Sequence, residues 1–262
     1  MRIRTIMLML SLLVLATACT TKTHVAKSTA LEATERQGPN LKKAARERLS
    51  LGFQYLQMGK IERAKHNFDK AMQHDPGSAE VQLGMGWYFE QVKEPAKSRK
   101  FYKRAISIEP NNGDNLNTYA SFLCAQGDYS SADKYYRKAI KQPEFANLAA
   151  AIENAGLCAQ KAGDMHKAQK YFEKALNHNP EQAKSLLSLA EIWFDKKDYF
   201  RSRAFLSRHL AVSRPSPQAL WLGIRLERML GDKDALSSYQ LQLVRLFPKS
   251  REAQLYLSSV SK

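Results

Sequence analysis

The sequence lacks the short motifs that organise most catalytic and metal sites. It has no His-Glu-x-x-His or Cys-x-x-Cys spacing, no Gly-x-Ser-x-Gly and no glycine-rich phosphate loop. Acidic pairs such as Asp195 and Asp198 fall in expected turns, where helix capping explains them. We therefore expect no catalytic residue, no metal site and no cofactor, and the sequence argues against an enzyme. The six histidines are scattered at His24, His66, His74, His166, His178 and His209.

The sequence also lacks an apolar run long enough to cross a membrane. The longest run, IMLMLSLLVLA, follows Arg2 and Arg4 and precedes small residues. This layout is typical of a secretory signal peptide and too short for a membrane span. Residues 1–18 are therefore predicted to be a signal peptide, and the protein to be exported.

Cys19 ends the string LATAC, which resembles a bacterial lipoprotein box, where cleavage precedes a lipid-modified cysteine. Ordinary cleavage is the alternative, because Ala16 stands where the box prefers leucine. Thr20 is not the aspartate that signals retention at the inner membrane. The resemblance thus implies a lipid anchor in the inner leaflet of the outer membrane, with the protein facing the periplasm.

Residues 19–40 are expected to form the lipidated N-terminus and a flexible tether. They are polar, with few large apolar side chains, and Gly38 and Pro39 interrupt any helix. The remaining residues, 41–262, are expected to form one helical domain.

Acidic residues are scarce relative to basic ones, 25 against 41, which gives a net charge of +16. A basic protein suggests nucleic-acid binding, but an exported protein meets no regular nucleic-acid partner, so none is expected. The lysines and arginines gather on one side of the expected second helices, around residues 97–104, 134–141 and 167–174. This side is either simply solvated or is drawn to anionic lipid headgroups, peptidoglycan or an acidic partner.

A period of 34 residues organises everything after the tether. Small residues recur at intervals of 34, 34, 36, 34 and 34, and aromatic residues, further small residues and prolines recur in phase with them. Coinciding columns of this kind are typical of a tetratricopeptide array, in which each repeat is a pair of helices. The first column is Gly52, Gly86, Ala120, Gly156, Ala190 and Ile224.

The expected fold is all-α: a right-handed superhelical solenoid of about six tetratricopeptide (TPR) helical hairpins. A C-terminal capping helix is expected from about residue 251. Gly59, Gly127, Gly163 and Gly231 mark the turn between the two helices of a pair, and in the second repeat Lys93 stands there and is expected to alter the turn. The repeats are expected at about 45–78, 79–112, 113–146, 149–182, 183–216 and 217–250.

Two cysteines remain besides Cys19, and they lie 34 residues apart. Cys124 and Cys158 fall on the first helices of adjacent repeats, which pack side by side. In an oxidising compartment they could form a disulfide; the alternative is two buried thiols.

Several local strings depart from the general repeat consensus. They are YASFLCAQGDYSSADKYYRKAI, ENAGLCAQKAGDMHKAQKYFEKAL, RLERMLGDKDA and LFPKSREAQ. Together they resemble the type IV pilus biogenesis and stability lipoproteins, the PilF/PilW family of pilotins. The resemblance implies an outer-membrane lipoprotein that binds the type IV pilus secretin and promotes its localisation and multimerisation. The alternative is a periplasmic TPR lipoprotein adaptor in outer-membrane β-barrel or envelope assembly.

The partner-binding surface is expected on the first helices of the early repeats, where apolar side chains recur at helical spacing. Packing within the solenoid core is the equal alternative for the aromatic members. Later repeats are more polar at the same phases, with Glu153, Glu191, Arg225 and Arg228. Other pilus assembly proteins or peptidoglycan are further candidate partners. The candidate groove residues are Leu49, Phe53, Leu56, Leu83, Trp87 and Asn117.

Overall fold

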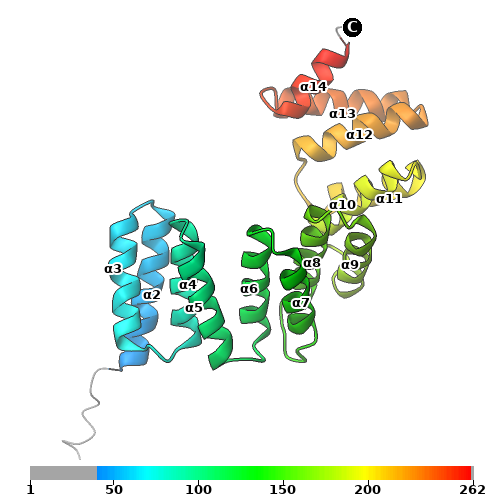
Figure 1. The fold of residues 1–262 in the computed structure, drawn as a ribbon. Coiled ribbons are helices and arrows are strands. Elements are labelled where there is room, and N and C mark those ends of the chain that lie inside the picture. The colour runs from blue at the N-terminus through cyan, green and yellow to red at the C-terminus, as the bar shows by residue number, and fades with distance from the viewer. Residues whose placement is uncertain (1–39, 261–262) are drawn as a thin grey trace, which may run out of the picture.

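The computed structural model describes residues 40–260, and this part of the chain is a row of paired helices without strands (Figure 1). The predicted signal peptide, Cys19 and all but the end of the predicted tether lie outside the described residues. Within them, no helix is both long and apolar enough to span a bilayer. The pairs are α2 (Leu41–Gln57) with α3 (Ile61–His74), α4 (Ala79–Gln91) with α5 (Pro95–Ile108), α6 (Gly113–Ala125) with α7 (Tyr129–Ile140), α8 (Leu148–Lys161) with α9 (Met165–His178), α10 (Ala183–Asp195) with α11 (Tyr199–Val212), and α12 (Pro217–Leu230) with α13 (Lys233–Leu246); α14 (Arg251–Val260) follows them.

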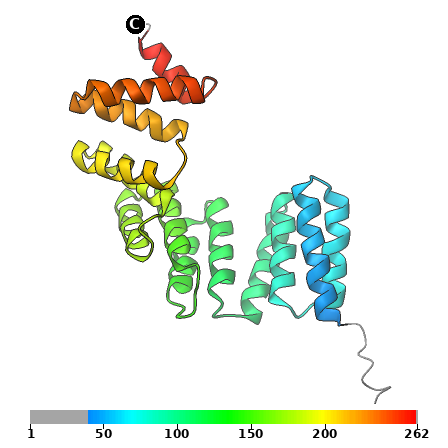
Figure 2. The same cartoon turned by 180° about the vertical axis from the view of Figure 1, so that it is seen from behind.

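The contacts between helices define an inner and an outer side of the array. Each first helix, from α2 to α10, contacts the first helix of the next pair, and α12 contacts α14. Each second helix contacts its own partner and the next first helix, but within residues 40–260 no two second helices contact each other. The first helices therefore form the inner side and the second helices spread along the outer side. The row bends as a whole, as both views show (Figures 1 and 2).

The small column of the sequence lets the two helices of a pair approach closely. A Cβ atom added to Gly86 would lie 2.7 Å from the ring of Tyr102, so no larger residue fits without a shift. The second helix contributes a small residue as well, and the Ser98 hydroxyl donates a 2.8 Å hydrogen bond to the carbonyl of Gly86. The predicted TPR solenoid is confirmed, and the packing explains why its period is so regular.

The sixth pair departs from the predicted column by one residue. A Cβ on Gly223 would lie 2.8 Å from the Tyr239 ring, so Gly223 has the role assigned above to Ile224. Ile224 is instead fully buried in the core of the last pair. The sixth pair therefore also has a small residue at this contact, but it lies one residue earlier than the repeat length predicts.

The turn of the second pair keeps the geometry of the others. Lys93 has a φ of 60°, close to the 69–81° of the four turn glycines, and Lys197 in the fifth pair has 63°. The backbone N–H of Glu94 donates to the carbonyl of Phe89 at 2.8 Å, and Asp128 makes the equivalent bond to Leu123 at 2.9 Å. The expectation that Lys93 alters the turn is wrong, because lysine adopts the left-handed conformation there.

The last helix, α14, closes the array at the expected place. It packs on α12 and α13, where Ala253 is fully buried. The Gln218 amide donates to Glu252 at 3.2 Å, and the Arg228 guanidinium lies 5.9 Å from the centre of the Tyr256 ring. The inner side of the sixth pair is thus covered, whereas no further pair precedes α2 in the described part of the chain.

Candidate functional site

An aromatic pair marks the inner side of the first two repeats. Phe53 on α2 and Trp87 on α4 stand at the same position of consecutive repeats, and their ring centres are 5.1 Å apart. Phe53 also makes an edge contact at 5.2 Å with the fully buried Phe68. Both side chains are partly exposed. The rings therefore rest on the core and keep part of their surface exposed, and their role in binding a partner stays a prediction.

Three further predicted residues flank this pair. Leu56 packs against the core of the first two pairs and Leu83 against that of the next, and both keep part of their surface exposed. Asn117 on α6 accepts a hydrogen bond from Asn154 at 3.5 Å, so the surface turns polar at the third repeat. We call Phe53, Leu56, Leu83 and Trp87 the inner apolar face.

Leu49 does not belong to this surface, which corrects the sequence-based assignment. Its side chain is only 3 % exposed and fills the space beside Gly84, where α2 meets α4. A partner cannot reach it. Leu49 stands at a helix position that usually faces the groove. Because Gly84 has no side chain, however, α4 approaches α2 closely and covers Leu49.

Two of the polar inner residues of the later repeats, Glu153 and Arg228, make contacts within the array. The Glu153 carboxylate is buried and accepts two hydrogen bonds from Ser185, at 3.0 Å from the backbone N–H and 2.9 Å from the hydroxyl. It thereby caps the start of α10, whose own N-cap residue makes no such bond. Arg228 is engaged by α14. Glu153 is therefore not available to a partner, whereas Arg228 stays exposed beside α14.

Glu191 and Arg225 remain on the inner side of the fifth and sixth repeats. The Arg225 guanidinium lies 4.2 Å from the centre of the Phe194 ring. Burial raises the pKa of the Glu191 carboxyl, and Asp195 raises it further, while Arg225 opposes the shift. This end of the inner side is therefore charged and partly closed, in contrast to the inner apolar face.

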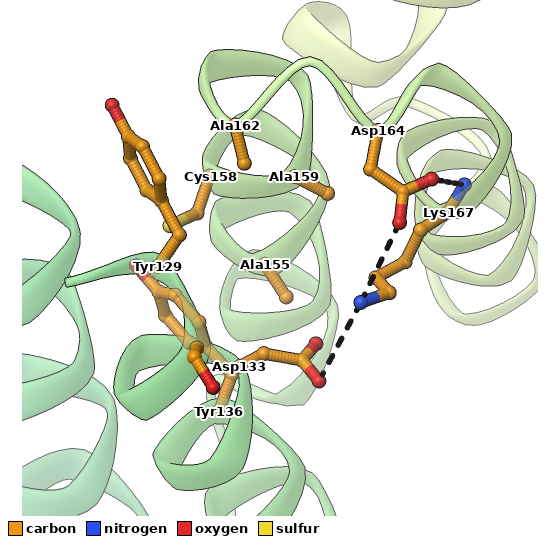
Figure 3. A pocket seen from close by; sticks show the side chains of 10 residues that line it. Tyr129, Asp133, Tyr136, Ala155, Cys158, Ala159, Ala162, Asp164 and Lys167 are labelled. Carbon is orange, nitrogen blue, oxygen red and sulfur yellow. Dashed lines mark hydrogen bonds and ion pairs between the residues drawn. The ribbon is translucent and has the colours of Figure 1, made fainter. Parts of the chain in front are cut away.

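Cys124 and Cys158 are joined by a disulfide, with their Cα atoms 5.9 Å apart. The bond links α6 to α8, the first helices of the third and fourth pairs. A pocket of about 210 Å³ lies beside it, between α7, α8 and the start of α9 (Figure 3). Its floor is formed by Cys158 and small residues of α8, Ala155 and Ala159 among them.

The polar groups at the mouth of this pocket are already paired with one another. Asp133 accepts a 2.7 Å hydrogen bond from the Tyr171 hydroxyl, and Lys167 Nζ lies 3.9 Å from Asp133 and 3.6 Å from Asp164 (Figure 3). Hydrogen bonding by the Lys167 backbone lowers the pKa of Asp164. Sequence reasoning missed this pocket; its one signal is the run of alanines at helical spacing on α8, which resembles ordinary helix packing.

No arrangement in residues 40–260 suggests bond-making chemistry. No group of three or more His, Cys, Asp or Glu side chains in that range could hold a metal ion. The exposed features are an aromatic face, a charged face and a shallow pocket, and these are the features of binding surfaces.

Comparison with known proteins agrees with the architecture. A tetratricopeptide-repeat family model matches residues 49–114 and 153–219, and a second one matches residues 101–134. The chain is 32 % identical over 206 residues to the type IV pilus assembly protein PilF of Pseudomonas aeruginosa, covering 79 % of this chain and 82 % of that protein.

Two solved structures have the same arrangement of helices. The structure of Pseudomonas aeruginosa PilF superposes with a TM-score of 0.74 at 30 % identity, over 84 % of this chain and 99 % of that one. PilW, described as a widely conserved type IV pilus biogenesis factor, superposes with a TM-score of 0.70 at 23 % identity, over 81 % and 98 %. At that identity the second match supports the fold alone.

Proposed function

This chain belongs to the family of tetratricopeptide-repeat scaffolds, not enzymes, that includes the type IV pilus assembly protein PilF, and we propose that it is an outer-membrane pilotin. In this role it is a lipoprotein that binds subunits of the type IV pilus secretin, the pore through which the pilus fibre passes. It promotes their localisation and multimerisation, and is needed for pilus biogenesis and twitching motility.

One observation carries the proposal: the similarity to PilF extends over nearly the whole array. The chain covers 82 % of that protein in sequence and 99 % of its solved structure. A general TPR protein would share the repeat columns but not a matching number of pairs in the same arrangement at 30 % identity.

The inner apolar face is the docking surface of the proposal. It presents two aromatic rings and two leucines that are held by the core and still partly exposed. A helix of a partner can place apolar side chains against such a face at i, i+3 and i+4 spacing. Aromatic anchors fixed by their own packing lose little conformational freedom on binding, which is why they often dominate the affinity.

The lipid anchor completes the proposal. Cys19 lies outside the described residues, and the support for lipidation is the string LATAC that it ends and the signal-like segment before that string. Because α2 begins at Leu41, about twenty residues separate the two. A flexible chain of that length spans roughly 25 Å, from ~5–6 Å × √n, so the array would stay close to the membrane.

The test is the state of the secretin in a strain that lacks this protein. Membranes are fractionated, and secretin multimers are detected by electrophoresis of unheated samples. The strain is complemented with the wild type or with Cys19→Ala. We expect the multimers to vanish or to leave the outer membrane without the protein, and to return with the wild type.

The Cys19→Ala variant separates two roles of the lipid. If multimers form at the wrong membrane, the lipid determines where the secretin is localised. If no multimers form, the lipid is needed for their assembly. Intact multimers at the outer membrane in the deletion strain would refute the pilotin role. General envelope defects in that strain would instead favour the adaptor of β-barrel or envelope assembly.

A further inference from the structure

The outer side of the array carries a band of cations along three consecutive second helices, α5, α7 and α9 (Figure 1). All its members are exposed, and no carboxylate among the described residues lies within ion-pair distance of any of them. We call this set the outer basic face. Its nine members are Lys100, Lys103, Arg104, Lys134, Arg137, Lys138, Lys141, Lys170 and Lys174.

The acidic residues on these helices do not neutralise the face. Helix α5 has none, α7 has Asp133 and α9 has Glu173. Asp133 already accepts a hydrogen bond from Tyr171 and lies near Lys167, and Glu173 accepts one from Gln169 at 2.6 Å. The nine cations therefore repel one another, and no ion pair among the described residues offsets the repulsion.

Helix α11 shows that this is not a general property of the second helices. Its three arginines are all engaged: Arg201 pairs with Asp198 at 3.2 Å, Arg203 pairs with the buried Glu227, and Arg208 donates to the carbonyl of Pro180 at 3.2 Å. Unpaired charge thus concentrates on the middle of the outer side.

The same face is hollowed along α7. A depression of about 380 Å³ runs along this helix, and four of the six residues that line it are cations. It is large enough for a phosphate group and open to solvent. The lining residues are Ser130, Asp133, Lys134, Arg137, Lys138 and Lys141.

We propose that the outer basic face binds the surface of an anionic phospholipid bilayer. Charges spread over three helices, with one shallow depression and no shaped apolar cleft, suit a partner that offers many mobile phosphates in one plane. Nucleic acid fits less well, because the aromatic rings near the face are engaged in packing: Phe101 stacks on Phe89 and Tyr135 contacts Tyr119.

The position of the outer basic face is consistent with the proposed function. The inference rests on that function in one respect, the lipid anchor that keeps the array near a membrane. An anchor about twenty residues before α2 holds the array within reach of the headgroups, which raises their effective concentration at the face. Because the second helices lie opposite the first helices, contact through the outer basic face leaves Phe53 and Trp87 turned away from the membrane. The inner apolar face then stays open to a protein partner.

The test measures binding to vesicles with the chain from residue 19 onward carrying Cys19→Ala, which lacks both the apolar signal-like segment and the site of lipid anchoring. Vesicles are made of phosphatidylcholine alone or of an equimolar mixture with phosphatidylglycerol, and binding is followed by co-sedimentation. The test variant is Lys134→Gln, Arg137→Gln and Lys138→Gln together. The matched control is Arg245→Gln, Lys249→Gln and Arg251→Gln, which removes the same charge from exposed positions at the C-terminal end of the array.

Four results are expected. The unsubstituted outer basic face binds the mixed vesicles and not the neutral ones, and about 0.5 M salt releases it because that shortens the Debye length to a few ångströms. The α7 variant binds at least about 10-fold more weakly, while the control changes less than about twofold. Since the N-terminal segment is the same in all variants, the difference belongs to the face. Helicity and melting are measured to show that each variant is folded.

Three results would overturn the inference. Equal loss in both triple variants would mean that net charge matters and not the face. Equal binding to neutral vesicles would exclude an electrostatic contact. Loss of binding to isolated sacculi, with binding to mixed vesicles unchanged, would assign the face to peptidoglycan. Secretin multimers are measured in a separate experiment. The vesicle experiment can therefore refute membrane binding by the outer basic face without refuting the pilotin role, and the secretin experiment can refute the pilotin role without refuting membrane binding.

Discussion

The two ends of the array place different chemistry at the same position of the helical pair. In the first two repeats this position holds Phe53 and Trp87, whose rings touch each other. In the fifth it holds Glu191, and in the sixth, where the phase shifts by one residue, Arg225 lies one residue beyond it. The backbone of the pairs is the same in both places.

The difference follows from what covers each end. At the C-terminal end, α14 lies over the inner side of α12, so polar groups there are used to fasten helices together. At the N-terminal end, the described chain places nothing over Phe53 and Trp87 beyond each other and the core beneath them. The repeats of a solenoid thus share one backbone arrangement, and those whose inner side stays exposed are the ones suited to binding.

The disulfide lies between these two ends, in the third and fourth repeats. Its removal has the largest expected effect on stability. Replacing both Cys124 and Cys158 with alanine frees a loop of 34 residues. In the chain-entropy model this lowers the free energy of unfolding by about 3 to 4 kcal/mol. Chemical denaturation measures it. Reduction of the wild type should give the same loss and leave the double variant unchanged; equal stability of all three would contradict the prediction.

Leu49 and Leu56 separate the core of the first repeat from its surface. Leu49→Ala should lower the free energy of unfolding by about 3 kcal/mol, because it opens a cavity between α2 and α4. Leu56→Ala, at a partly exposed position, should lose about 1 kcal/mol. Thermal and denaturant unfolding of the two variants decides it, and the reverse order would place Leu49 on the surface after all.

Phe53 and Arg225 test the binding function at the two ends of the inner side. Phe53→Ala should weaken binding to the secretin by about 2 kcal/mol, or about thirtyfold, with helicity unchanged. Trp87→Ala should act in the same way, and Arg225→Ala should have little effect on binding. Titration calorimetry with purified secretin periplasmic domains measures all three. If the Phe53 and Trp87 variants melt early and bind normally once folded, both rings serve the core alone.

The two lysine turns offer a smaller change in stability. Lys93 and Lys197 adopt positive φ, a conformation that costs a residue with a Cβ about 1 kcal/mol relative to glycine. Lys93→Gly should therefore raise the free energy of unfolding by up to about 1 kcal/mol. Gly127→Lys, the reverse change at an equivalent turn, should lower it by a similar amount. Loss of stability in Lys93→Gly would mean that its side chain makes a contact worth more than the strain.

The sequence-based prediction succeeds where structure depends on neighbours along the chain. Repeat length, helix pairing, turn positions and the closing helix all follow from spacing, because each pair packs on the next in the same way. It fails where helices from different repeats meet. Leu49 is covered because Gly84 lacks a side chain, and Glu153 is buried because α10 needs a cap. Neither condition is visible in the helix that carries the residue.

The one-residue shift to Gly223 has the same origin. In the column of the first five repeats, Ile224 appeared to be a tolerated exception, whereas the ring of Tyr239 selects the residue that must be small. The partner ring lies on the second helix and is also displaced by one position. The repeat length can be found from one set of recurring residues. In a divergent repeat, the position of the small residue can be found only together with the ring that packs on it from the second helix.

The smallest expected effect is the pH response of Glu191, which tests whether the charged end of the inner side carries a cost. Burial raises its pKa above the ordinary value of 4.5, so between that value and the folded-state pKa the folded protein binds more protons than the unfolded one. Stability from this group is therefore present at low pH and lost as the pH rises through the folded-state pKa. Glu191→Gln should be more stable than the wild type at neutral pH, and the difference should shrink as the pH falls towards 4.5.

Urea unfolding of both proteins across this range measures the difference, with Glu144→Gln at an exposed position as the control. A difference that does not change with pH would assign the effect of the substitution to packing. A less stable Gln variant at neutral pH would show that attraction to Arg225 outweighs burial. The attraction between Glu191 and Arg225 would then stabilise the charged end. The two ends would differ in the partners that they suit and not in stability.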